Sequence, residues 1–336
     1  MSDVKTNTAA GRVFWIDAAR AFAMLAIVWS HSMSAAYPAD TATAWGMYIG
    51  SASLFFMASG ALVFPVRPSA GVFLRRRLGS YLPQWLLFTV AYVVLIRLTG
   101  IPVLDDYRFN NLLKFAPLLS PWEGGWFLYS LTGLYLFAPV LSPWLTRASR
   151  RGILSFIALW MVAGFLPVIG AVAEIVPAES LVAPFAGFAG YMVAGYYLSR
   201  RPLKERNARQ RSLYFLIWGV IAFGLGVAVY ANASKWGYTR VMYYDLTFAT
   251  MSANMLIFGL FTMIGTAPAW LCKPVSWISR HSLTIYLWHL LMIRYVLVPM
   301  NVAPALIFPL TLVIVLPLSA LTDKAFAPLT RRLRGV

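Results

Sequence analysis

The sequence predicts an all-α protein, a polytopic transmembrane bundle of about ten helices, and three observations support this prediction. Sixty per cent of the 336 residues are hydrophobic, and the mean hydropathy is +0.70. Only 12% of the residues are charged, which is about half the fraction found in soluble domains. Apolar stretches long enough to cross a bilayer recur along the whole chain.

Ten apolar stretches define the predicted helices, and the length of each is close to the roughly 20 residues that span a bilayer core. The first contains Asp17 and Arg20, which interrupt it, and no small-residue cleavage site follows it. We therefore expect a retained membrane helix rather than a cleaved signal peptide. The predicted ranges are 14–36, 43–66, 82–100, 125–145, 152–172, 181–199, 213–231, 247–267, 275–297 and 303–322.

The basic residues orient these helices. With the N-terminus in the cytoplasm, the inner segments carry 21 Lys and Arg residues and the outer segments carry 6, so both termini are predicted to be cytoplasmic. This placement accounts for the net charge of +17 without a nucleic-acid partner. We expect one integral membrane domain over residues 1–336. It would have a cytoplasmic tail at 1–12, an outer loop at 101–124 and a basic cytoplasmic loop at 200–212.

Three ionisable side chains lie in the first apolar stretch, where each charge costs about 2.5–3.5 kcal/mol. Asp17 and Arg20 are neighbours at i, i+3 and can pair. His31 follows Arg20 by 11 residues, which at 100° per residue places it only about 20° from the same helix face. All three can therefore line one interior surface. The alternative is a structural ion pair together with one hydrogen-bonded core histidine.

The predicted ninth helix carries the other two histidines. His289 shares a face with Tyr286 at i, i+3, and both a functional and a structural role are open for it. His281 lies near the predicted cytoplasmic end, where an interfacial role is the simpler interpretation. Three histidines and the single Cys272, without a Glu-x-x-His motif or a cysteine pair, do not predict a metal site.

Two further groups stand near predicted helix ends. Arg75, Arg76 and Arg77 precede the third helix on the cytoplasmic side. They could set the topology and contact lipid headgroups, or they could bind the phosphates of a cytosolic cofactor. Glu123 stands beside tryptophans at the outer start of the fourth helix. These tryptophans normally anchor a helix at the interface, but with a carboxylate they could also orient a sugar hydroxyl.

Several segments, in their order and spacing, resemble the acyltransferase-3 family. The opening segment RVFWIDAARAFAMLAIVWSH is similar to the family's first helix, which combines an arginine, an Asp-x-x-Arg motif and a late histidine. The residues that match this pattern are Arg12, Asp17, Arg20 and His31. The other segments similar to family helices are SASLFFMASGALVF, FLRRRLGSYLP, GGWFLYSLTGLYLFAPVL, GYMVAGYYLSR and SLTIYLWHLLMI.

The resemblance implies transfer of an acyl group from cytosolic acyl-CoA to a hydroxyl of an extracytoplasmic carbohydrate or glycolipid. The default donor is acetyl-CoA, no metal cofactor is expected, and the expected location is the bacterial inner membrane, in contact with lipid. His31 is the expected general base, because a neutral imidazole can take the hydroxyl proton during attack on the thioester. Asp17 and Arg20 would hold the first helix in place and polarise the path along which the reactive end of the donor reaches the acceptor.

The same resemblance implies roles for the remaining candidates. Arg75, Arg76 and Arg77 are expected to hold the phosphates of coenzyme A. Family members often carry a second arginine three residues after the one at Arg77, and Ser80 occupies that place here, which leaves Arg75 or Arg76 as its substitute. Glu123 and His289 are further candidates for positioning the acceptor or moving a proton.

Two non-enzymatic functions compete with this interpretation. A transporter or flippase of a lipid-linked sugar would use the same buried charges as a translocation path. The sequence does not show the broken helices in paired halves that many transporters carry. A scaffold without activity in a glycan-assembly complex is the second competitor.

Overall fold

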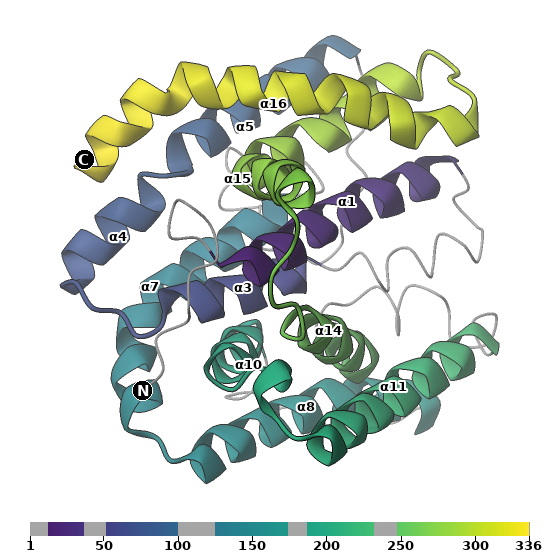
Figure 1. Cartoon of the computed structure of the whole chain (residues 1–336). Coiled ribbons are helices and arrows are strands. Elements are labelled where there is room, and N and C mark those ends of the chain that lie inside the picture. The colour runs from purple at the N-terminus through teal and green to yellow at the C-terminus, as the bar shows by residue number, and fades with distance from the viewer. Residues whose placement is uncertain (1–12, 37–51, 100–124, 174–186, 232–246, 336) are drawn as a thin grey trace. The chain divides into compact units, whose positions relative to one another are not determined.

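The structure is a computed structural model that describes residues 13–36, 52–99, 125–173, 187–231 and 247–335 (Figure 1). Within these ranges the chain forms α-helices, one 3₁₀ turn and one π-helical turn, and it contains no strand. The prediction of an all-α protein is therefore confirmed for the described part of the chain. The predicted tail at 1–12 and the predicted outer loop at 101–124 lie outside the described residues.

Every one of the ten predicted ranges overlaps a described helix, and the first range matches its helix to the residue. The helices are α1 (Phe14–Ala36), α3 (Ser53–Val63), α4 (Ala70–Leu78), α5 (Leu82–Thr99), α7 (Gly125–Arg147), α8 (Arg150–Ala173), α10 (Ala189–Arg200), α11 (Ala208–Ala231), α14 (Phe248–Phe261), α15 (Ala269–Met292) and α16 (Pro304–Arg334). The 3₁₀ turn η1 covers Leu203–Glu205, and the π-helical turn η2 covers Ile293–Leu297. Sequence analysis did not predict α4 as a separate helix.

Three helices in the described ranges are long and apolar enough to cross a membrane: α7, the Ala208–Val227 part of α11, and α16. A fourth span is possible if α4 and the Leu82–Leu95 part of α5 count as one crossing with a bend of 41°. These helices fit a membrane bundle. Ten crossings and the cytoplasmic location of both termini remain predictions.

The chain divides into two compact units, with the boundaries after Ser30 in α1, after Pro65, after Leu141 in α7 and after Arg280 in α15. Unit 1 holds α3, α8, α10, α11 and α14, with the first parts of α1 and α15. Unit 2 holds α4, α5, η2 and α16, with most of α7 and the last parts of α1 and α15. The predicted single domain over residues 1–336 remains a prediction.

Unit 1 is built around close contacts of α10 with α3, α8 and α14. The tightest of them depend on glycine. A Cβ atom at Gly60 in α3 would lie 2.0 Å from the carbonyl oxygen of Met192, and one at Gly195 in α10 would lie 2.0 Å from that of Met57. Because helices in a membrane associate chiefly through such close backbone packing, these two glycines set the separation of α3 and α10.

Replacing Gly195 with alanine is therefore expected to destabilise unit 1 by roughly 1–3 kcal/mol or more, because the obstructing atoms are backbone atoms that cannot rotate away. The measurement is the thermal unfolding midpoint of the purified protein in detergent. Gly219→Ala in α11 is the matched control, because its Cβ would meet no atom within 4 Å. Equal midpoints for the two variants would contradict the proposed packing role.

Unit 2 is held together by contacts of α16 with α4, α5 and η2. Polar bonds supplement the apolar packing. The Trp288 indole donates a 2.9 Å hydrogen bond to the Thr322 hydroxyl, which joins α15 to α16, and the Trp288 ring packs edge-on against Phe88 of α5. The hydroxyls of Tyr81 and Thr132 are 2.6 Å apart and connect the start of α5 to α7. This arrangement brings the last part of α15 against its neighbours within unit 2.

Candidate active site

His31 and His289 lie side by side within unit 2. The last turns of α1 carry His31, and α15 carries His289 three residues before its end. Their ring centroids are 5.3 Å apart and the ring planes are tilted by 49°. His289 is fully buried, whereas His31 is half-buried. Sequence analysis singled out both residues separately, and the structure brings them together.

The hydrogen bond of His289 determines which ring nitrogen can act as a base. Its Nδ1 lies 2.6 Å from the carbonyl oxygen of Tyr286. A carbonyl oxygen only accepts hydrogen bonds, so Nδ1 must carry the hydrogen and donate it. The Nε2 atom is buried and has no hydrogen-bond partner among the described residues. In the neutral ring Nε2 therefore presents a lone pair that can accept a proton, or a hydrogen bond from a hydroxyl group.

The Tyr286 ring packs against His289, and Phe127 of α7 packs against Tyr286 in turn. The Tyr286 ring is 5.3 Å from the His289 ring and 5.1 Å from the Phe127 ring, measured between centroids. The shared helix face of Tyr286 and His289 predicted from their i, i+3 spacing is consistent with this contact. The His289 imidazole is fully buried, so bulk water does not reach it directly.

Arg294 is a candidate that sequence reasoning missed. It lies on the π-helical turn η2, is half-buried, and is close enough to His31 for its charge to act on that ring. Single π-helical turns inside helices often occur at functional sites. Its charge within the predicted apolar range 275–297 could have marked Arg294 as a candidate site residue. In the sequence it was counted only among the basic residues at the outer helix ends.

Asp17 is held by two serines in unit 1. Its carboxylate accepts hydrogen bonds from the Ser279 hydroxyl at 2.7 Å and from the Ser276 hydroxyl at 3.1 Å. The Asp17 side chain is buried, and Arg20 one turn further along α1 is half-buried. Sequence analysis predicted an interaction of Asp17 with Arg20 but not these serines, which lie more than 250 residues away in the chain. Asp17 therefore helps to join α1 to α15, and these hydrogen bonds give it a structural role.

The three arginines at the end of α4 have different surroundings. Arg75 donates a 3.1 Å hydrogen bond from Nε to the carbonyl oxygen of Leu333 at the end of α16. The Arg77 guanidinium lies 5.8 Å from the ring centroids of both Phe73 and Tyr135. Arg76 is exposed and has no partner among the described residues. Arg76 is therefore the member of this group most available to an anion.

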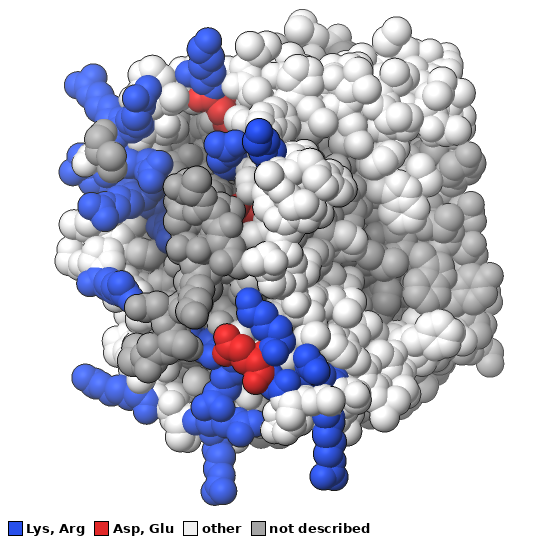
Figure 2. Space-filling view, viewed as in Figure 1, with Lys and Arg blue, Asp and Glu red and all other residues white. Residues whose placement is uncertain are grey.

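The end of α16 adds positive charge next to α4. Contacts between the two helices and the bond from Arg75 place its last turn beside the α4 arginines. Basic side chains gather over these helix ends in Figure 2. The α16 residues that contribute are Arg331, Arg332 and Arg334. Sequence analysis counted them only toward the topology. Ser80, in place of the expected second arginine, donates its hydroxyl hydrogen to the Arg77 carbonyl oxygen at 2.6 Å.

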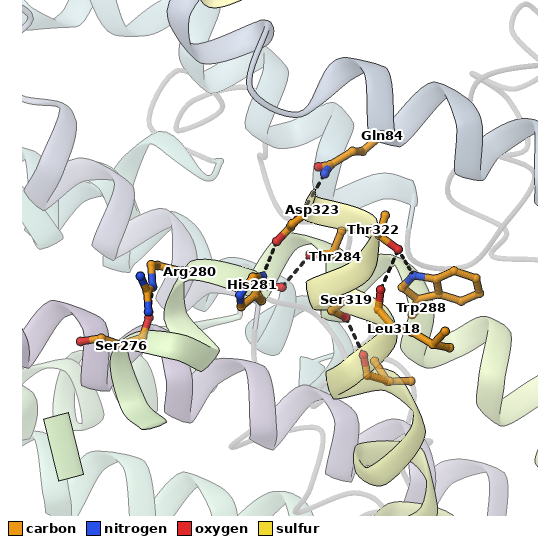
Figure 3. Close-up of polar contacts among 11 residues, drawn as sticks. Gln84, Ser276, Arg280, His281, Thr284, Trp288, Leu318, Ser319, Thr322 and Asp323 are labelled. Atoms are coloured by element: carbon orange, nitrogen blue, oxygen red, sulfur yellow. Dashed lines mark hydrogen bonds and ion pairs between the residues drawn. The ribbon is translucent and has the colours of Figure 1, made fainter. Parts of the chain in front are cut away.

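A second polar group in unit 2 centres on Asp323 of α16 (Figure 3). One carboxylate oxygen lies 2.5 Å from Nδ1 of His281 in α15, and the other accepts a 2.9 Å hydrogen bond from the Gln84 amide in α5. Asp323 thus joins three helices. His281 was expected to be a simple interfacial residue, and its carboxylate partner more than 40 residues away could not be inferred from the sequence.

Replacing Asp323 with alanine is expected to lower the free energy of unfolding by about 1–3 kcal/mol, because both His281 and Gln84 lose their partner. Chemical denaturation of the purified protein measures this change. Lys324→Ala removes an exposed neighbouring side chain and is the control. If both variants unfold alike, the Asp323 cluster has no structural importance.

The remaining predicted candidates have simpler outcomes. Glu123 lies outside the described residues. No group of three or more His, Cys, Asp or Glu side chains in the described ranges could hold a metal ion. The arginines at the ends of α4 and α16 form a basic group within unit 2, and their role in binding the phosphates of a coenzyme remains a prediction.

Apolar helices of membrane length are typical of an integral membrane protein, and the pair of histidines on α1 and α15 is a candidate site for proton transfer. The chain belongs to the acyltransferase-3 family, whose pattern, described as an acyltransferase domain, matches residues 13–324. This match covers nearly the whole chain and confirms the resemblance seen in the sequence. It supports a membrane acyltransferase as the class of enzyme. Neither the curated proteins nor the solved structures contain a match.

Proposed function

We propose that this protein is an O-acyltransferase that moves an acetyl group from cytosolic acetyl-CoA, or a related short acyl-CoA, to a hydroxyl of an extracytoplasmic carbohydrate or glycolipid. The observation that carries the proposal is the contact of His31 with His289, where a buried ring nitrogen has a lone pair and no partner among the described residues. A bacterial inner membrane is the proposed location.

His31 is the proposed general base. It takes the proton from the acceptor hydroxyl while the hydroxyl oxygen attacks the carbonyl carbon of the thioester. The resulting tetrahedral intermediate collapses with loss of the C–S bond. The imidazolium then returns its proton to the leaving thiolate, which yields an ester and coenzyme A with a free thiol. Every proton taken up by His31 is thus released within one turnover.

The neighbours of His31 support this chemistry in different ways. The Nε2 lone pair of His289 is suited to accept a hydrogen bond from a second hydroxyl of the carbohydrate and so to orient the acceptor. The charge of Arg294 acts at His31 and can stabilise the negative oxygen of the tetrahedral intermediate. Asp17 and Arg20 are assigned a supporting role on α1, and Glu123 remains a proposed residue for acceptor positioning.

A reconstituted assay tests the proposal directly. The protein is inserted into liposomes with radiolabelled acetyl-CoA and candidate glycan or glycolipid acceptors, and the acceptors are analysed for an added acetyl ester. Formation of a labelled ester that requires the protein is the expected result. Vesicle uptake of a lipid-linked sugar without ester formation would instead establish the transporter alternative and reject the proposal.

The phosphates of the donor are assigned to Arg75, Arg76 and Arg77, with Arg76 foremost because it is exposed and has no described partner. Arg76→Gln is expected to raise the KM for acetyl-CoA about tenfold, the effect of losing one charge-assisted hydrogen bond, with little change in kcat. Steady-state kinetics with varied acetyl-CoA measures both constants. Arg67→Gln, an exposed arginine before α4, is the control. An unchanged KM in Arg76→Gln would remove this residue from the donor site.

A further inference from the structure

A cavity of about 690 Å³ lies in unit 1, where α10 continues through η1 into α11. The start of α8 closes one side of it through Arg150, whose Nε donates a 3.4 Å hydrogen bond to the Tyr197 hydroxyl. The cavity is within the size range of small-ligand sites. It lies in the other unit from His31, His289 and the α4 arginines, so the proposed reaction leaves it without a role.

The lining of this cavity is strongly basic. One acidic residue, Glu205, stands against four arginines, which are Arg150, Arg200, Arg201 and Arg206. None of the four forms an ion pair with a carboxylate in the described ranges. Figure 2 shows basic side chains around acidic atoms over the connection from α10 to α11. The excess positive charge is therefore available to an anionic ligand.

Part of this basic group is held in place by aromatic contacts. The Arg206 guanidinium lies 5.8 Å from the Tyr197 ring centroid and 6.0 Å from that of Tyr214, and it donates a 3.0 Å hydrogen bond to the Arg201 carbonyl oxygen. Such contacts restrict the arginine to a narrow range of orientations. The guanidinium of Arg201 is exposed and has no partner among the described residues.

Part of the lining is apolar and exposed at the surface. Leu213, Ile217 and Trp218 of α11 contribute there, and the first two side chains are 53% and 44% exposed. They belong to the Ala208–Val227 segment, which has the length and hydropathy of a membrane span and is only 11% buried. In a membrane this face of α11 meets acyl chains, so the basic cavity opens directly onto lipid.

We propose that this cavity binds the headgroup of an anionic phospholipid. The phosphodiester lies against the arginines, which can form charge-assisted bidentate hydrogen bonds with it. The upper acyl chains follow Leu213 and Ile217 along α11. A soluble phosphorylated compound would use the arginines but would leave the apolar part of the lining without a partner. The predicted cytoplasmic position of the 200–212 loop fits the leaflet in which basic pockets between helices bind anionic lipids.

Fluorescence quenching by brominated lipids tests this proposal independently of acyl transfer. The full-length protein is placed in phosphatidylcholine nanodiscs that contain small, increasing fractions of phosphatidylglycerol brominated in the upper acyl chains. Saturable quenching is expected, and Trp218→Phe should remove its high-affinity part, because Trp218 lines the cavity. Brominated phosphatidylcholine should need about ten times the fraction for the same quenching. Equal quenching by the two lipids would overturn the proposal.

Paired variants separate the cavity from general surface attraction. Arg150→Gln with Arg201→Gln is expected to weaken phosphatidylglycerol binding about tenfold. The control pair is Arg151→Gln with Arg209→Gln. Both arginines are exposed and close in sequence to lining residues, but neither lines the cavity, so this pair should leave binding unchanged. Equal weakening by both pairs, or displacement of the lipid by equimolar free coenzyme A, would contradict the proposal. If the first pair of variants does not fold, the comparison of quenching by brominated phosphatidylglycerol and brominated phosphatidylcholine on the unmodified protein still tests the proposal.

Discussion

Replacing His31 with alanine is expected to lower the kcat of acyl transfer by about 10²–10⁴-fold, the range that a positioned general base contributes. The physical reason is that the acceptor hydroxyl would have to lose its proton without the imidazole that is positioned to take it. Expression, membrane insertion and the thermal unfolding midpoint should change little, because the half-buried His31 ring makes no hydrogen bond with another described residue.

The matched control for this variant is Ser34→Ala, a half-buried residue one turn further along α1. It should retain both kcat and stability, so a loss limited to His31→Ala cannot come from a general disturbance of the helix end. Turnover near the unmodified level in His31→Ala would remove this residue from its proposed role, even if the family assignment stands.

Two substitutions of His289 are expected to separate its structural hydrogen bond from its free nitrogen. In His289→Asn the side-chain amide can still donate to the Tyr286 carbonyl oxygen, as Nδ1 does now, but the lone pair of Nε2 is lost. The variant should therefore fold with a similar unfolding midpoint, while kcat falls by about 10²-fold. Steady-state kinetics and thermal unfolding of the same preparation measure the two effects.

His289→Phe provides the complementary comparison. It fills the buried volume but donates nothing to the Tyr286 carbonyl, so it should lose both activity and stability. An asparagine variant with full activity would show that Nε2 takes no part in the reaction. An asparagine variant as unstable as the phenylalanine variant would show that His289 has a structural role alone.

The helices were predictable to the extent that hydrophobicity determines them. The range 14–36 agrees with α1 because the extent of an apolar run indicates where a helix begins and ends. The helix α4 was missed because Arg75, Arg76 and Arg77 make its hydropathy low, although its residues form a regular helix. Apolar windows detect membrane spans and overlook short polar helices at their ends.

The candidate site was predictable in its residues but not in their partners. Ionisable groups such as His31 and His289 stand out in an apolar sequence because placing them there is costly. Their juxtaposition depends on how α1 packs against α15, which periodicity within one helix cannot specify. The same limit applies to Asp17 with Ser279, since a serine in an apolar helix gives no signal of its own. Arg294 was recognised as a candidate only once the structure showed that it lies on a π-helical turn.

The contact between α4 and the end of α16 has a practical consequence for handling the protein. Gly335 ends α16 in a left-handed conformation, with φ of +71°, and a Cβ atom there would lie 2.8 Å from the Arg75 guanidinium. An affinity tag fused at the carboxyl terminus would thus begin beside the arginines assigned to the donor phosphates. A polyhistidine or acidic tag placed there could alter the measured affinity for acetyl-CoA by itself. Kinetic comparisons therefore require protein from which such a tag has been cleaved.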